Sequence, residues 1–239
     1  MTTINPIIIP VFANDDFIVI NKTTALNFHT EDNQPGLFEQ VKALLRLTEL
    51  YPVHRLDKLT TGLVIFAKTQ PIAAAFGRLF ERKKVNKFYL AVSDHKPKKK
   101  QGWVKGDMAK ARRGAWKLLR SMDNPAVTQF ISQPMNGADK PGCRLFLVKP
   151  HSGKTHQIRV ALKSVGSPII GDQLYYPNVQ NEAQNNPADR GYLHAYGLKF
   201  SLGGQAYNFV APPTNGRLFI ATECSEQLSQ HWSEPWTLF

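Results

Sequence analysis

The chain has 239 residues, a hydrophobic content of 42% and a formal net charge of +12 at pH 7. That length allows one large domain with a buried core, and no apolar run approaches the ~20 residues that a membrane-spanning helix needs. The two cysteines, Cys143 and Cys224, form no CxxC pair and the N-terminus lacks a basic signal-peptide region, so we expect a protein of the reducing cytoplasm with no membrane partner.

The first part of the chain predicts strands interrupted by two helices. Four apolar segments bounded by turn residues are expected to be strands: 7–12, 17–21, 63–67 and 85–92. Leu37, Val41, Leu44, Leu45 and Thr48 mark one face of a first helix. A second helix, capped by Thr69, follows through residues 72–80.

The later part predicts mostly paired strands. The expected elements are a strand pair (126–132 and 144–149) across a Gly/Pro turn (134–142), a helix (156–165), a surface loop (177–189), a hairpin (191–200 and 207–211) and a terminal helix (218–232). The segment 93–124 suits either short strands or a mobile basic insert. Because strict βαβ alternation is missing, we expect an α+β fold with a mixed, mostly antiparallel central sheet and flanking helices.

The positive charge is concentrated in one stretch of the chain. Residues 78–120 hold 15 Lys and Arg against three acids, and this stretch accounts for the whole excess of +12. Such segregation is typical of a protein that binds a phosphate backbone, and Trp103 and Trp116 within the stretch could stack on bases. A solvated basic face and an anionic membrane surface are the alternatives. We favour nucleic acid.

The best candidate for chemistry is the polar loop His54-Arg55-Leu56-Asp57, which comes just before the apolar run 63–67. A carboxylate held among cations keeps its charge and can act as a nucleophile or a base. Taken alone, Asp57 could equally be a helix cap or a structural ion-pair partner. We expect His54 to donate a hydrogen bond to the backbone, because no Ser or Cys lies at a recognisable spacing.

A second polar cluster runs from His151 to Arg159 and brings several donors beside a glycine at the expected start of a helix. Such a position is a natural anion site. Arg159 falls one turn into that helix, close enough to a loop to pair with a carboxylate. Tyr89, on a strand that leads into the basic stretch, forms a third candidate, and Asp172 is expected to cap or support the turn after Gly171.

Five ordered blocks now carry a family resemblance. They are Asp15-Asp16-Phe17-Ile18-Val19-Ile20-Asn21-Lys22, His54-Arg55-Leu56-Asp57 with Thr60-Thr61-Gly62, Lys154-Thr155-His156-Gln157-Ile158-Arg159, Pro168-Ile169-Ile170-Gly171-Asp172 and Leu193-His194-Ala195. Together these blocks resemble the RluA-type family of RNA pseudouridine synthases, over roughly residues 8–220. One block alone would be weak evidence, whereas five in order are a specific signal.

The resemblance implies an isomerase that detaches uracil from its ribose at N1 and rejoins it through C5. It implies that Asp57 is the catalytic aspartate, that Arg159 pairs with it, and that Tyr89 stacks on the uracil and assists loss of the C5 proton. Arg55 would hold the base out of its helix, since extrusion costs a few kcal/mol. The remaining expected substrate-binding residues are His54, Lys154, His156, Gln157, Lys98, Lys99 and Lys100.

The resemblance also implies a pseudouridine synthase-like fold with a catalytic cleft, and one catalytic domain (1–239) of two packed lobes. No metal and no organic cofactor are implied, and no separate N-terminal RNA-binding domain is expected. We expect a monomer that needs no protein partner and acts on ribosomal or transfer RNA. Lys154, which stands in place of a usual arginine, keeps the charge but loses the planar fork.

A second class of function is compatible with the same residues. A non-catalytic RNA-binding or RNA-folding module could use the same basic cleft, because a fold does not fix an activity. The two readings differ in one structural respect, namely whether Asp57, Tyr89 and Arg159 converge on one cavity. His156 and His194 are expected to support the fold or the residues that touch the substrate.

Overall fold

The structure is a computed structural model that describes residues 7–136, 142–176 and 188–239. Within these residues ten strands form one sheet in the order β1-β2-β4-β11-β5-β10-β9-β6, with β3 paired to β4 and β12 to β11. These strands are β1 (Ile8–Ala13), β2 (Phe17–Lys22), β3 (Tyr51–Pro52), β4 (Thr61–Ala67), β5 (Asn86–Ser93), β6 (Gln101–Gly106), β9 (Ala126–Pro134), β10 (Arg144–Pro150), β11 (Leu193–Leu202) and β12 (Gln205–Val210). A small separate ribbon pairs β7 (Met108–Lys110) with β8 (Trp116–Leu118).

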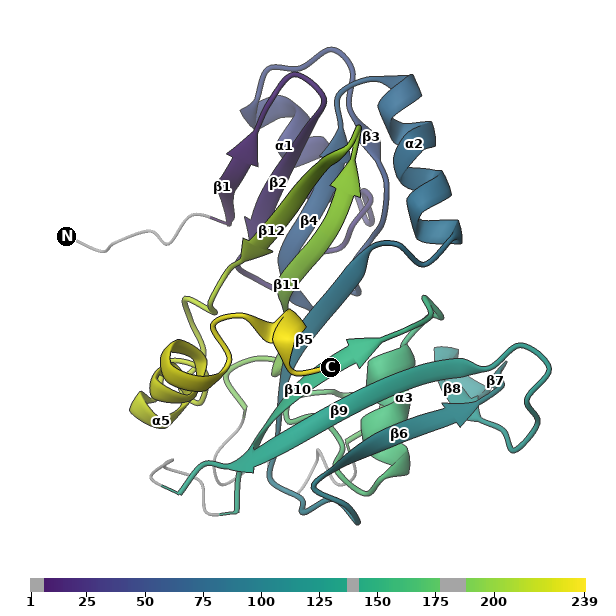
Figure 1. Cartoon of the computed structure of the whole chain (residues 1–239), viewed down its shortest axis with the longest axis vertical. Helices are drawn as coiled ribbons and strands as arrows, with labels where there is room; N and C mark the ends of the chain where they lie inside the picture. The colour runs from purple at the N-terminus through teal and green to yellow at the C-terminus, as the bar shows by residue number, and fades with distance from the viewer. Residues whose placement is uncertain (1–6, 137–141, 177–187) are drawn as a thin grey trace.

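The described helices are short and lie around this sheet. They are α1 (Leu37–Leu44), α2 (Gln70–Glu81), α3 (Gln157–Ser164) and α5 (Thr222–Glu226). Figure 1 shows β1, β2, β4, β11 and β12 with α1 and α2 in the upper half, and β6, β9 and β10 with α3 in the lower half. Strand β5 runs between the halves, so the sheet is continuous through both.

The sheet is mixed and mostly antiparallel, which confirms the expected α+β fold. Strands β4 and β11 are the parallel pair among the described strands, through His194 opposite Thr61 and Ala195 opposite Gly62. Gly62 has a φ of +106°, and a Cβ there would lie 2.2 Å from the carbonyl oxygen of Ala195. Glycine is required at this crossing because two backbones approach closely, just after the Asp57 loop.

Two hydrophobic clusters fix the elements that carry the loops. The smaller one lies beneath α2, where the rings of Phe17, Phe76 and Phe200 meet with centroids 5.3–5.7 Å apart. The larger one joins β5, β10 and α3 and continues to the C-terminal segment. Aromatic pairs at these separations add to the free energy of burial, so both halves give rigid support to the loops between them.

Most expected elements are confirmed, and the departures have local causes. Helix α1 ends at Leu44, because Arg46 adopts a left-handed backbone (φ +52°). Leu44, expected on the buried face, is 57% exposed. The terminal helix begins at Thr222 instead of residue 218, since Phe219 and Ile220 turn back to hydrogen-bond with the Gly216 carbonyl.

Other expectations concern loops and caps. The basic segment 93–124 forms the short strands β6, β7 and β8. Thr69 occupies the cap position of α2, but its side chain makes no capping hydrogen bond. Residues 137–141 of the expected Gly/Pro turn and 177–187 of the expected surface loop lie outside the described residues.

Candidate active site

The loop that carries Asp57 connects β3 to β4, and the ammonium group of Lys22 fixes it through hydrogen bonds to its backbone. Lys22 Nζ donates hydrogen bonds to the carbonyl oxygens of Leu26 (2.8 Å), Lys58 (3.0 Å) and Asp57 (3.2 Å). Burial lowers the pKa of Lys22 to about 7, although the charge of Asp57 opposes this shift. Sequence reasoning did not single out Lys22 for a role; the available signal was a lysine at the end of the apolar strand β2.

His54 fixes the other end of the same loop and is not a donor as expected. Its Nε2 accepts a hydrogen bond from the backbone N–H of Ile65 at 3.0 Å. Burial, followed by the charge of Lys87, lowers the pKa of His54 to about 3, so the ring is neutral and able to accept. The expected donor role is therefore wrong, while the expected structural contact to the backbone is present.

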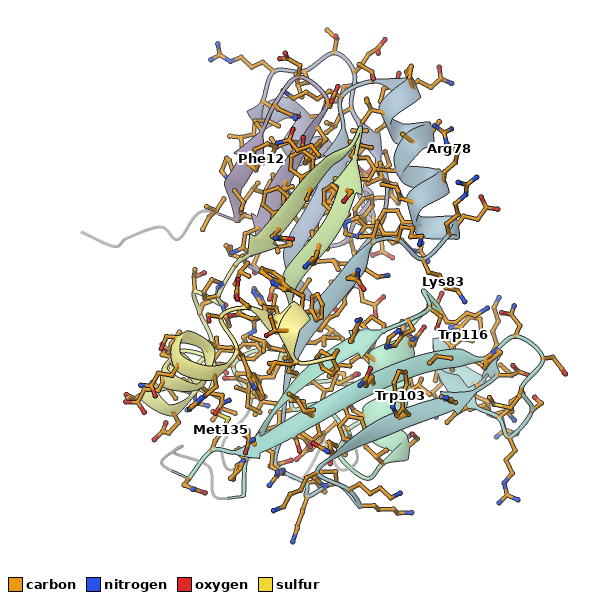
Figure 2. All side chains as sticks on the ribbon, in the orientation of Figure 1. Phe12, Arg78, Lys83, Trp103, Trp116 and Met135 are labelled. Atoms are coloured by element: carbon orange, nitrogen blue, oxygen red, sulfur yellow. The ribbon has the colours of Figure 1, made fainter. Side chains whose placement is uncertain are left out.

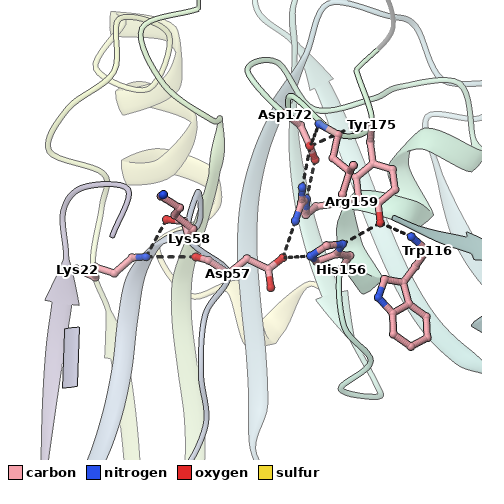
Figure 3. A network of polar contacts seen from close by, with 9 residues as sticks. Lys22, Asp57, Lys58, Trp116, His156, Arg159, Asp172 and Tyr175 are labelled. Atoms are coloured by element: carbon pink, nitrogen blue, oxygen red, sulfur yellow. Dashed lines mark hydrogen bonds and ion pairs between the residues drawn. The ribbon is translucent and has the colours of Figure 1, made fainter. Parts of the chain in front are cut away.

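Arg159 links Asp57 to a second, buried carboxylate. Its Nε and Nη2 donate to Asp172 Oδ2 (2.7 Å) and Oδ1 (2.8 Å), and its Nη1 donates to Asp57 Oδ2 at 3.1 Å (Figure 3). The side chain of Asp172 is 0% exposed, whereas that of Asp57 is 28% exposed. Burial by itself would lower the pKa of Arg159, but the carboxylates of Asp172 and Asp57 outweigh the effect of burial and raise that pKa. The buried carboxylate of Asp172 thus neutralises the guanidinium, and the remaining Nη1 donor of the guanidinium orients Asp57.

Asp172 does more than the expected turn support. Besides its fork with Arg159, Oδ1 accepts hydrogen bonds from the backbone N–H groups of Leu174 (3.0 Å) and Tyr175 (3.2 Å). The same carboxylate therefore caps the turn after Gly171 and fixes the arginine. Its position among the ordered sequence blocks was the available signal for the second role.

His156 precedes α3 and lies beside Asp57 in a left-handed backbone conformation (φ +56°). Its Nε2 is 3.9 Å from Asp57 Oδ2, and its Nδ1 is hydrogen-bonded to the Tyr175 hydroxyl at 2.8 Å. That hydroxyl accepts the backbone N–H of Trp116 at 2.7 Å, so a polar chain joins β8 to Asp57 (Figure 3). Burial and then Arg159 lower the pKa of His156. A non-glycine residue held in this backbone conformation beside a partly exposed carboxylate favours a functional role for the pair.

Gln157 joins the loop before α3 to strand β9 instead of pointing free groups at a ligand. Its side-chain oxygen accepts from Ser152 Oγ (2.8 Å) and from the Lys154 backbone N–H (3.0 Å). Its amide nitrogen donates to the Val127 carbonyl and to Thr128 Oγ1, both at 3.0 Å. Since both amide donors and both acceptor positions are used, Gln157 acts through the loop that it holds.

Tyr89 lies in the middle of β5, opposite Val148 on β10 and Ala195 on β11. Its side chain is buried and lines the same cleft as Asp57. Burial, followed by the charge of Asp57, raises its pKa well above the usual value. The phenol therefore stays protonated at neutral pH and presents an apolar ring with one donor.

Eight of the eleven expected site residues line one cleft of about 860 Å³. Its lining includes His54, Arg55, Asp57, Tyr89, Lys154, His156, Gln157 and Arg159. Arg55 is exposed on this cleft and Lys154 is half-buried. Lys98, Lys99 and Lys100 are exposed on the segment before β6, outside the residues that line the cleft. His194, expected to support the fold, is buried and hydrogen-bonds Thr61 Oγ1 and the Ala211 carbonyl.

The described residues contain no group of three or more His, Cys, Asp or Glu side chains placed to hold a metal ion. None of the helices in the same residues has the length and apolar character required to cross a membrane.

Comparisons with known proteins agree with this geometry. Residues 16–164 match the model of a family described as RNA pseudouridylate synthase. A Haemophilus influenzae protein described as an uncharacterised RNA pseudouridine synthase is 44% identical over 225 residues, which cover 94% of this chain and 96% of that protein. The ribosomal large subunit pseudouridine synthase D of the same organism is 33% identical over 69% of this chain, which spans about half (52%) of that relative. The solved structure of human RNA pseudouridylate synthase domain containing 1 has the same fold, with a TM-score of 0.70 at 22% identity, over 86% of this chain and 83% of that one.

Proposed function

Since the chain belongs to the RluA-type family of RNA pseudouridine synthases, isomerases that convert uridine in RNA to pseudouridine, we propose that Asp57 is its catalytic aspartate. The single observation that carries this assignment is the shared cleft of Asp57, Arg159 and Tyr89, with Asp57 Oδ2 3.1 Å from Arg159 Nη1. The non-catalytic RNA-binding reading does not require this convergence.

The reaction needs a carboxylate that is charged, aimed and accessible. Arg159 orients the Asp57 carboxylate. Because Asp172 binds two of the donors of Arg159, the guanidinium does not fully neutralise Asp57. The Asp57 side chain retains 28% of its exposure toward the cleft, which leaves it in reach of a ribose or base carbon. Fixing the reactive group in this way lowers the entropic part of the activation barrier.

Tyr89 and Arg55 complete the assignment. The Tyr89 ring stacks on the target uracil, and its raised pKa favours this role over that of a general base for the C5 proton. Arg55, exposed on the cleft, holds the neighbouring phosphate or the extruded base, which offsets the few kcal/mol that extrusion costs. Lys154 and the exposed lysines at 98–100 add charge toward the RNA backbone.

The substrate that we propose is structured RNA, ribosomal or transfer, acted on in the cytoplasm by a monomer that needs no protein partner. The relatives named as ribosomal large subunit pseudouridine synthases support ribosomal RNA as the first choice. The basic stretch 78–120 supplies the electrostatic attraction that either RNA requires.

Tritium release tests the activity directly. The protein is incubated with ribosomal and transfer RNA transcripts that carry tritium at uracil C5, because isomerisation must exchange that hydrogen with water. We expect release with at least one transcript from wild type and none from Asp57→Asn. Binding without release from any transcript would support the RNA-binding module instead.

A further inference from the structure

Trp103 is a large aromatic side chain that the structure leaves on the surface of the cleft. It lies on β6, which ends the strand order of the sheet, and 51% of it is exposed. Its ring lines the same cleft as Asp57. An indole exposed on the lining of a cleft offers a ligand a large apolar face together with one N–H donor.

The position of Trp103 is fixed by its neighbours. Its ring lies beside the His151 imidazole with centroids 4.8 Å apart and planes inclined by 30°. His151 is itself held, because its Nε2 is hydrogen-bonded to Gln129 Oε1 at 3.2 Å and its backbone N–H donates to the Val127 carbonyl at 2.8 Å. Gln129 is the register partner of Trp103 on β9. The imidazole therefore packs against the indole, and this contact preorganises the Trp103 ring on the cleft.

The electrostatic surroundings of this surface suit RNA. Lys105 Nζ lies over the Trp103 ring in a cation–π contact, 5.1 Å from its centroid, and Lys83 and Lys149 line the same cleft. Figure 2 shows Lys83 near the end of α2 in the upper half and Trp103 on the lower half. Burial, then Lys149, Lys105 and Lys83, lower the pKa of His151, so its ring adds aromatic surface without charge. An aromatic face surrounded by ammonium groups matches a nucleobase with its flanking phosphates.

We propose that Trp103 and His151 form a stacking subsite for an unpaired nucleobase that neighbours the target uridine, with Lys105 and Lys83 on the adjoining phosphates. This subsite rests on the proposed function, because it assumes that the uridine itself enters beside Asp57. An RNA substrate must therefore be single-stranded or splayed at that neighbouring nucleotide. Stacking discriminates weakly between bases, so the subsite favours an accessible local structure over a sequence.

Trp116, the other tryptophan of the basic stretch, does not share this role. It is half-buried on β8 and lies outside the cleft lining, and its backbone N–H donates to the Tyr175 hydroxyl. The sequence suggested two equivalent stacking residues, whereas the structure assigns stacking to Trp103 and a backbone contact to Trp116.

The test measures binding separately from turnover. The probe is a uridine heptanucleotide, titrated against Asp57→Asn protein that carries Trp103→Ala, Trp103→Leu, Trp103→Phe or no further change. We expect Ala and Leu to weaken binding by about 5- to 100-fold and Phe by much less, because Leu keeps apolar area but not the π face. Equal affinity of the Leu variant and the parent would overturn the subsite. Thermal unfolding of each variant shows that the fold is kept, as expected for a half-exposed residue.

The lysines give a matched control for the electrostatic part. Lys83 lines the cleft, whereas its neighbour Lys84 is exposed outside the lining. We expect Lys83→Gln to reduce the slope of log affinity against log salt by roughly 0.7, the value for one phosphate contact on single-stranded nucleic acid, and Lys84→Gln to leave it unchanged. Equal slopes for both variants would remove Lys83 from the subsite.

Wild-type tritium release separates the two proposals. Release from wild type together with parental affinity in Trp103→Ala and Trp103→Leu would overturn the subsite and leave the activity intact. Absence of release, with affinity that still depends on the π face of residue 103, would overturn the proposed function and leave the subsite as a nucleobase site.

Discussion

The loop that carries Asp57 and the strand that carries Trp103 line the same cleft, but their side chains are held in opposite ways. Around Asp57, the supporting groups Lys22, Arg159 and Asp172 are buried and hydrogen-bonded. Around Trp103, the side chains of His151, Lys105 and Lys83 are exposed or half-buried. The difference teaches that the proposed catalytic group is held in a fixed geometry, while the proposed contact surface for the RNA is left adaptable.

The two regions also differ in how charge is treated. In the Asp57 region the buried Arg159 is paired with the carboxylates of Asp172 and Asp57, and Asp57 is the partly exposed one of the two. The Trp103 region leaves its positive charge uncompensated, which favours association with a polyanion. Changes on the first side should therefore affect turnover and stability, and changes on the second should affect binding and its salt dependence.

The largest expected effect comes from Asp57→Asn. The amide keeps the shape but cannot act as a nucleophile or a base, so turnover should fall by roughly 10⁴-fold or more. RNA affinity should stay near wild type, because Arg159 keeps its fork with Asp172 and the exposed lysines are untouched. Single-turnover tritium release and a filter-binding titration check both parts. Turnover by this variant near the wild-type rate would show that another group does the chemistry.

Asp172→Asn should have the largest effect on stability. It removes one partner of a buried ion pair and leaves Arg159 poorly compensated, a change that costs about 3–5 kcal/mol in the free energy of unfolding. Asp57→Asn is the matched control, since it removes a carboxylate from the same guanidinium at a partly exposed position and should cost less than about 1 kcal/mol. Urea denaturation measures both. Similar losses for the two variants would mean that the two carboxylates support Arg159 equally.

Local patterns in the sequence predicted most of the strands, because these depend on neighbouring residues. Alternation and apolar runs located β1, β2, β4, β5, β9, β10, β11 and β12 within one or two residues, whereas β3 was not predicted and the basic segment of β6, β7 and β8 was left undecided. The pairing of Asp57 with Arg159 across 102 positions came from the ordered blocks, and the structure confirms the contact.

The contacts that were missed depend on the sheet order, which local patterns do not encode. Lys22 reaches three carbonyls because β2 lies beside β4, and Asp172 meets Arg159 because the turn after Gly171 folds back on α3. No sequence pattern predicted the left-handed backbone of His156, because a histidine indicates that conformation much less specifically than a glycine does. Leu44 was wrongly predicted to be buried, because helical spacing does not show at which residue a helix ends.

The buried histidines of the Asp57 region should make the fold sensitive to acid. The pKa values of His54 and His194 are lowered to about 3, mainly by burial, against 6.5 for the unfolded chain. Between these values the unfolded chain binds more protons than the folded one, so stability is full above pH 6.5 and falls as the pH drops toward 3. Thermal unfolding between pH 4 and pH 8 measures this fall. His54→Gln should flatten it, whereas His231→Gln, at an exposed position, should leave it unchanged.

The smallest expected effect concerns Lys98, Lys99 and Lys100, which are exposed beyond the cleft lining. If they contact the RNA backbone, replacing all three with Ala should flatten the salt dependence of binding by a slope of up to about 2. The fold should be kept, because the described hydrogen bonds of these residues use backbone groups: the Lys98 N–H donates to the Val165 carbonyl, and the Lys100 carbonyl accepts from Ser132 Oγ. An unchanged slope, together with a lower slope for Lys83→Gln, would restrict the RNA interface to the cleft. A lower slope in both cases would extend it along the whole basic stretch, past the edge of the sheet.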